Sequence, residues 1–299
     1  VSARKMIRYN FFFRFILGPC KYNDIAAMLQ NDHSQKPLSY FWAMKHLDDD
    51  IRELLEQKFH QYNHSGFIQD DPVSVPHAFT EKEDIEIAGF LAATIAWGQR
   101  PVIIRNAQLL MQWMDYSPSD FIRHAGDADM RHFSSFRHRT FNGDDCIIFI
   151  RALQRMYREE GGLEGVFTAC WNEHAGDAGR AISGFREMFF SGMEAGRTGK
   201  HVADPLKGSS AKRINMFLRW MVRADHAGVD FGIWKGISPA GLCCPLDVHT
   251  GRVARKLGIL ERKTDDWTAV VELTGALKTI DPLDPVRFDF ALFGLGMYE

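Results

Sequence analysis

Apolar residues recur at three- and four-residue spacing through most of the chain after Met44, and this period constrains the fold more than any other feature. In the segment 45–62, Leu47, Ile51 and Leu55 fall on one face, which indicates an amphipathic helix packed on a core. No stretch alternates polar and apolar residues over enough positions to require a sheet. The predicted fold class is therefore all-α. Further helices are predicted at 85–98, 102–114, 144–162, 163–173, 179–190, 212–223, 247–257, 266–277 and 286–294.

Capping residues predict where several of these helices begin. Thr80 and Glu83 form a capping-box pattern before the helix at 85–98. Asp284 followed by Pro285 is a favourable N-cap and first-turn pair, so we expect the last helix to begin there.

The patterns divide the chain into four segments. Residues 1–43 combine a basic start with an aromatic run that is unlike the rest, and Met44 stands directly before the first clear helix. We interpret 1–43 as an extension and expect the working protein to start near Met44. An N-terminal helix and loop follow at 44–84, then a helical domain at 85–223 and a C-terminal segment at 224–299.

Composition limits the functions open to the chain. With 299 residues, of which 45% are hydrophobic, it can bury a large core. The formal net charge of −2 argues against a protein that coats nucleic acid through charge alone, so any DNA contact must come from a local patch and from backbone amides. No apolar run approaches the roughly 20 residues that span a bilayer, so no membrane partner is expected.

The cysteines and histidines give no strong metal pattern. His60 and His64 stand four residues apart, but no third ligand is evident, so neither a metal nor a cofactor is expected. We interpret the cysteines as reduced thiols of a cytoplasmic protein, because their number is odd and their spacing matches no disulfide or cluster framework. They are Cys20, Cys146, Cys170, Cys243 and Cys244.

The residues that can carry chemistry lie between Gly208 and Gly258. Ser209 or Ser210 can cap a helix that holds Lys212 in its first turn. A lysine is normally disfavoured beside the positive end of a helix dipole, and a nucleophilic lysine must be neutral, which such a position favours. The alternative is an ordinary surface lysine on a basic helix.

A second candidate stands at the start of the next helix. Asp247 follows Pro245-Leu246 and precedes the helix that Gly258 ends. A helix N-terminus keeps a carboxylate ionised, which suits an electrostatic partner for a nucleophile. Asp is also a favoured N-cap, so a purely structural role explains it equally well.

Four segments resemble one family when they are taken together. PLDVHTGRVARKLG is similar to the PVDTHVxRVxxRLG segment of the helix-hairpin-helix (HhH-GPD) base-excision DNA glycosylases, the superfamily of endonuclease III and the 8-oxoguanine glycosylases. GSSAKRINMFLRW resembles that superfamily's hairpin and following helix, LPGVGRKTANVVL. FLAATIAWGQRPVIIRNAQLLMQWM and FNGDDCIIFIRALQRMYREEGG look like its early helix pair and the helix that precedes the hairpin. The PLDxHxGRxxRxLG signature is typical of a bacterial branch.

The resemblance implies a monomeric, two-lobed helical bundle that holds double-stranded DNA across the cleft between its lobes and rotates a damaged base into a pocket. Lys212 would attack the sugar, and Asp247 would stabilise the developing positive charge. Removal of an oxidised purine, with or without strand cleavage, is the expected activity. The implied DNA contacts are Gln99, Gly208, Ser209, Ser210, Arg213, His249 and Arg252, and the aromatic residues expected to stack on the base are Trp220 and Trp234.

Two departures from the family pattern keep alternatives open. Ser210 replaces a hairpin glycine that exposes a backbone amide, and the longer segment before Asp247 makes Lys235 a rival nucleophile. A DNA-binding protein of the same fold without catalysis therefore remains an alternative. The other is an all-α interaction protein or metal-dependent enzyme unrelated to DNA.

Overall fold

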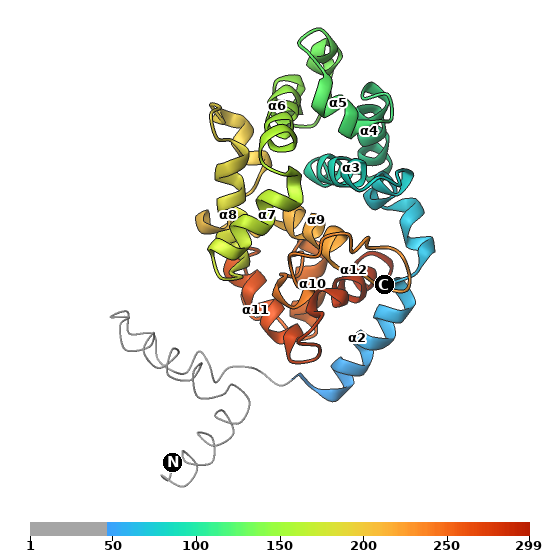
Figure 1. Cartoon of the computed structure of the whole chain (residues 1–299). Coiled ribbons are helices and arrows are strands. Elements are labelled where there is room, and N and C mark those ends of the chain that lie inside the picture. Colours follow the sequence, from blue (N-terminus) through green and yellow to red (C-terminus); the bar gives the residue numbers. More distant parts are fainter. Residues whose placement is uncertain (1–46) are drawn as a thin grey trace, which may run out of the picture. The chain divides into compact units, whose positions relative to one another are not determined.

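The computed structural model describes residues 47–299, and in this range the all-α prediction is confirmed (Figure 1). The predicted extension at 1–43 and Cys20 lie outside the described residues. The segment Lys45–Glu299 forms one compact unit by its internal contacts. The α-helices are α2 (Asp49–Tyr62), α3 (Lys82–Thr94), α4 (Arg100–Trp113), α5 (Pro118–His124), α6 (Gly143–Glu159), α7 (Gly162–Glu173), α8 (Ala178–Phe189), α9 (Lys212–Val222), α10 (Val248–Lys256), α11 (Trp267–Lys278) and α12 (Asp289–Tyr298).

Short 3₁₀ turns and one small hairpin connect these helices. The hairpin pairs β1 (Arg137–His138) with β2 (Phe141–Asn142) in antiparallel register, with His138 opposite Phe141. The 3₁₀ turns are η2 (Ser65–Asp70), η3 (Pro72–Ser74), η4 (Pro76–Ala78), η5 (Asp129–Ser135), η6 (Gly196–His201), η7 (Pro205–Lys207), η8 (Pro239–Gly241) and η9 (Pro285–Phe288).

Local capping chemistry explains several helix starts. Asn142 and Asp145 form a capping box at the start of α6, and the carboxylates of Asp247 and Asp266 accept backbone N–H bonds at the starts of α10 and α11. Gly258 follows α10 with a φ of 68°, the left-handed conformation that glycine adopts without strain. These boundaries follow from residues within a few positions of each cap.

Three predicted caps are wrong. The N-cap of α3 is Glu81 rather than Thr80, because the Glu83 carboxylate binds the Arg123 guanidinium and does not close a capping box. The N-cap of α9 is Ala211 rather than Ser209 or Ser210, as described below. The last helix is preceded by η9, so that α12 begins at Asp289 and Asp284 caps the 3₁₀ turn without a side-chain bond.

α9, which carries the candidate nucleophile as its first residue, is a largely buried helix. Its residues from Ile214 to Val222 are all buried. It packs against α3, while α12 packs against both α10 and α2. Arg219 of α9 binds Asp289 at the start of α12, so α9 and α10 are both attached to α12.

Candidate functional site

Lys212 and Asp247 lie close together although they belong to different helices. The Lys212 Nζ atom is 3.7 Å from the Asp247 Oδ2 atom, and about a quarter of each side chain is exposed. The amine also lies 3.6 Å from the Met216 sulfur atom, one helical turn further along α9. An amine and a carboxylate with partial access to solvent are therefore presented side by side.

The orientation of Asp247 follows from its place before α10. Its Oδ1 atom accepts N–H bonds from His249 at 2.9 Å and from Thr250 at 3.0 Å. These bonds hold the carboxylate and leave Oδ2 for Lys212. The capping role and the pairing with Lys212 use different oxygen atoms, so one does not exclude the other.

The start of α9 has an unusual backbone. Ala211 adopts a φ of 47°, in the left-handed region that costs a non-glycine residue roughly 1 kcal/mol. The Ser209 hydroxyl accepts the Ala211 N–H, which makes a local turn instead of a helix cap. The left-handed conformation of the buried Ala211 sets the direction in which the chain enters α9, and Lys212 in its first turn lies near α10.

A cavity of about 580 Å³ opens beside this pair, within the size range of small-molecule pockets. Its wall combines four cations and three carboxyl groups with an apolar lining. The charged side chains are Arg100, Lys212, Arg213, Arg219, Asp71, Asp247 and Asp289, and the apolar ones include Phe67, Trp97, Ile103, Met216, Phe293 and Met297.

Five of the residues singled out from the sequence line this cavity, namely Gln99, Lys212, Arg213, Asp247 and His249. Gln99 is exposed at the turn between α3 and α4. Arg213 is tied down: its guanidinium donates to the Thr94 carbonyl and lies 4.6 Å from the centre of the Trp97 ring. Burial lowers the pKa of Arg213 to about 10.

The two tryptophans expected to stack on a base are placed elsewhere. Trp220 and Trp234 are 0% and 1% exposed and belong to the core. The Trp234 Nε1 atom donates to Glu86 Oε1 at 2.8 Å. Neither lines the cavity, so neither is placed to stack on a ligand there; Trp97 is the tryptophan in its wall.

Two further basic residues also lie outside the cavity wall. Lys235 is exposed, and its amine donates to the Gly232 carbonyl at 2.6 Å. Arg252 is exposed as well and donates to the Gly296 carbonyl at 2.7 Å. Of the two rival lysines, Lys212 is the one that lines the cavity.

The turn that resembles a hairpin is docked against α11. Gly208 has a φ of 85° and its carbonyl accepts the Trp267 N–H, while Ser209 bridges to Asp266. The Gly208 and Ser209 amides donate to the Pro205 and Asp204 carbonyls. These amides, expected to bind phosphate, therefore have internal partners.

The helix expected to precede that turn does not do so directly. α6 is separated from it by α7 and α8, and the element immediately before the turn is the 3₁₀ turn η7. The helices predicted at 163–173 and 179–190 are present as α7 and α8 and stand between α6 and this turn in the chain. Ser210, at the changed glycine position, is followed by Ala211, which takes the left-handed conformation.

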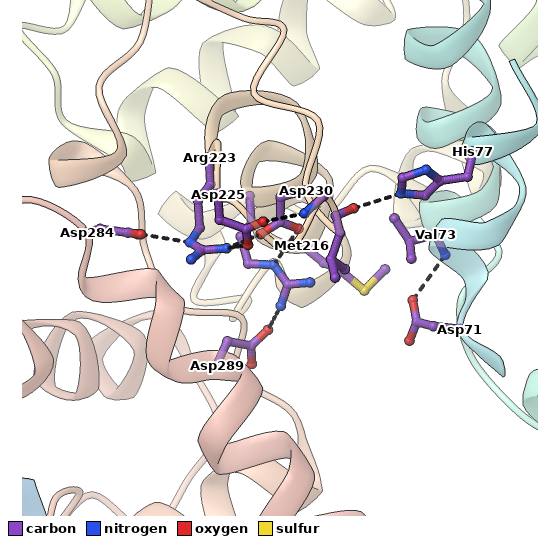
Figure 2. Close-up of polar contacts among 12 residues, drawn as sticks. Asp71, Val73, His77, Met216, Arg223, Asp225, Asp230, Asp284 and Asp289 are labelled. Carbon is purple, nitrogen blue, oxygen red and sulfur yellow. Dashed lines mark hydrogen bonds and ion pairs between the residues drawn. The ribbon is translucent and has the colours of Figure 1, made fainter. Parts of the chain in front are cut away.

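A buried charge network underlies the cavity (Figure 2). Arg219 donates to Asp230 at 3.2 Å and to Asp289, and Arg223 donates to Asp230 at 3.0 Å and to Asp284 at 2.7 Å. Burial opposes the charge on Arg219, but Asp230 and Asp289 outweigh it and raise its pKa. The network fixes α9 to the loop after it and to the start of α12.

Asp289 connects this network to the candidate pair. It is the first residue of α12, it lines the cavity, and it is 6% exposed. Burial raises the pKa of Asp289 to about 6, with Arg219 and Lys212 opposing the rise and Asp247 adding to it. This role could not be predicted from the sequence, because Asp289 stands among the apolar residues of a predicted helix.

Asp289 predicts a pH dependence of stability. Between its ordinary pKa of 3.8 and the native value of about 6, the unfolded chain gives up this proton while the native protein keeps it. The native state then binds more protons, so the contribution of Asp289 to the free energy of unfolding falls as pH rises through this window and is constant above it. Urea unfolding at pH 4, 5, 6 and 7 should show this fall in the wild type relative to Asp289→Asn. A difference that does not change with pH would contradict it.

The described residues, 47–299, hold no evident metal site. No group of three or more His, Cys, Asp or Glu side chains is arranged there to hold a metal ion. Within the same range, no helix combines the length and the apolar composition needed to cross a bilayer. The four described cysteines are unpaired.

The fold and the site define a class: an all-α protein whose charged cavity brings together the N-termini of two helices. The chain belongs to the family described as "Protein of unknown function (DUF2400)", whose family model matches residues 71–298. That range contains every residue of the cavity wall except Phe67. No curated protein and no solved structure matches the chain.

Proposed function

We propose that this protein is a DNA base-excision glycosylase in which Lys212 is the nucleophile and Asp247 its electrostatic partner. The observation that carries the proposal is the 3.7 Å separation of the Lys212 amine and the Asp247 carboxylate in the wall of a cavity of about 580 Å³. The sequence resemblance to the helix-hairpin-helix glycosylases supports it, because both residues fall at the matching positions.

The proposed reaction uses Lys212 at the start of α9 and Asp247 at the start of α10. A damaged base, such as an oxidised purine, is rotated out of the duplex into the cavity. The neutral Lys212 amine attacks C1′ of the sugar, and the base leaves with the electron pair of the glycosidic bond and takes up a proton. The amine then loses a proton as the sugar ring opens to a Schiff base. Asp247 stabilises the positive charge that develops on the sugar.

DNA binding is proposed to use the rim of the cavity. Gln99 is exposed beside it and would fill the space that the extruded nucleotide leaves in the duplex. His249 and Arg252, both in α10, would contact the DNA backbone. The internal partners of the Gly208 and Ser209 amides reduce what the turn before α9 can offer to phosphates, so the basic side chains at the rim carry more of the binding.

Borohydride trapping tests the proposal. The protein is incubated with duplexes that each carry one damaged base, and borohydride reduces any Schiff base to a stable covalent adduct. We expect an adduct with at least one oxidised purine. Salt-dependent duplex binding without an adduct on any lesion would favour a binding protein without catalysis, and no duplex binding at all would contradict both.

Asp247→Asn is predicted to separate the electrostatic role from the capping role. Asn keeps an oxygen for the His249 and Thr250 amides but removes the charge beside Lys212. Base release should fall by about a hundredfold, while the free energy of unfolding should change by less than about 0.5 kcal/mol.

Asp48→Asn is the matched control, because Asp48 caps α2 in the same way at an exposed position. Its rate of base release should equal that of the wild type. Release by Asp247→Asn at the wild-type rate would remove Asp247 from the mechanism.

A further inference from the structure

Asp71 faces the cavity from the side opposite to the charge network. It lies between η2 and η3, and its Oδ1 atom accepts the Val73 N–H at 3.0 Å. Figure 2 shows Asp71 projecting from this segment toward Met216, with Asp289 approaching from α12. All three residues line the same cavity.

The second carboxylate oxygen of Asp71 is available for a ligand. Asp71 is 7% exposed, and within residues 47–299 its carboxylate accepts a hydrogen bond from the Val73 N–H alone and takes part in no ion pair. A ligand that displaces water from this oxygen must replace the lost hydrogen bond, and a ligand N–H would do so. The feature therefore points to a hydrogen-bond donor on whatever enters the cavity.

Three cations of the cavity wall, Arg100, Lys212 and Arg219, stabilise the ionised form of Asp71, but burial has the larger effect and on balance its pKa is raised. The Val73 amide also stabilises the ionised form. An ionised carboxylate accepts hydrogen bonds and cannot donate them. In its ionised form Asp71 would therefore repel a ring nitrogen that carries a lone pair and would bind a ring N–H.

We propose that Asp71 is a specificity-determining residue that selects bases with a lactam ring N–H over bases with a ring nitrogen lone pair. Hypoxanthine, guanine and uracil belong to the first class, and adenine and cytosine to the second. The inference rests on the proposed function, because it assumes that the ligand of the cavity is an extruded base.

Asp71→Asn is a sharp test because the Val73 N–H fixes the side-chain orientation. The amide oxygen of Asn should take the place of Oδ1, which turns its NH₂ group toward the cavity. The substitution thus replaces an acceptor by a donor while it keeps the local cap.

Binding is measured with duplexes that carry one 2′-fluoro nucleotide, whose base resists release. The base is hypoxanthine or adenine, which differ in the ring N–H and the 6-substituent, and it stands opposite an abasic position so that pairing does not contribute. We expect the wild type to bind the hypoxanthine duplex about ten- to a hundredfold more tightly, the effect of one charged hydrogen bond. Asp71→Asn should abolish or reverse this preference.

Asp177→Asn is the control, because Asp177 caps α8 and does not line the cavity. It should keep the wild-type preference. Equal affinities in the wild type, an unchanged preference in Asp71→Asn, or no binding of either duplex would overturn the inference. If the preference for the hypoxanthine duplex depends on Asp71 but no borohydride adduct forms, the proposed chemistry is contradicted and the role of Asp71 is not. If an adduct forms but the wild type shows no such preference, the role of Asp71 is contradicted and the proposed chemistry is not.

Discussion

Lys212→Ala is expected to abolish the borohydride adduct and to lower base release by about a thousandfold, because it removes the attacking amine. The loss should not come from unfolding. Lys212 is partly exposed, and within residues 47–299 its amine has polar contacts with Met216 and Asp247 alone, at 3.6 and 3.7 Å, so little packing is lost. The rate of base release and the yield of the trapped adduct are measured on the same duplex, with circular dichroism as the check on folding.

Lys235→Ala is the matched control for this prediction. Lys235 is an exposed lysine whose amine donates to the Gly232 carbonyl, outside the cavity wall. Its variant should form the adduct in wild-type yield. If the adduct were instead lost in Lys235→Ala and kept in Lys212→Ala, Lys212 would not be the nucleophile, but the proposal of glycosylase activity would still hold.

Arg219→Met is expected to destabilise the protein by about 3–5 kcal/mol, the usual effect of removing one partner from a buried ion pair. Methionine fills much of the space of the aliphatic part of the arginine, so the loss of stability comes from the removal of the guanidinium charge. Asp289 loses its bond to the guanidinium, and Asp230 keeps only Arg223. The free energy of unfolding is measured in urea at pH 7.

Two further variants test the cause of this loss. Arg180→Met should change the free energy of unfolding by less than about 0.5 kcal/mol. The Arg180 side chain is 66% exposed, and its Nε atom lies 4.0 Å from the Asp177 carboxylate, so the ion pair is weak. The double variant Arg219→Met/Asp289→Asn should recover part of the loss, because it removes one of the stranded carboxylates. A double variant less stable than Arg219→Met alone would contradict this explanation.

Much of the fold was predictable because the signals that set it are local. The three- and four-residue spacing of apolar residues located α2, α4, α6, α7 and α8 to within a few residues. The failures came where a side chain had a distant partner. Glu83 would have capped α3, but Arg123 binds it from α5, and no pattern near Thr80 records that.

The candidate site was predictable only in part, for the same reason. Lys212 and Asp247 were found because each stands at a helix start, where its position relative to the backbone amides can be read from neighbouring residues. Trp220 and Trp234 were expected in the cavity because they are aromatic and near in sequence, but both side chains are enclosed in the core. Nearness in sequence does not give the direction in which a side chain points.

The all-α class, most helix boundaries and the helix starts that carry Lys212 and Asp247 follow from local sequence patterns. The 3.7 Å contact between these starts, and the position of Asp71 and Asp289 around the same cavity, are visible only in the folded protein. The difference lies in the sequence separation of the interacting residues. Helix periodicity and capping depend on residues a few positions apart, whereas a cavity is formed by the packing of elements from opposite ends of the chain, which no local pattern encodes.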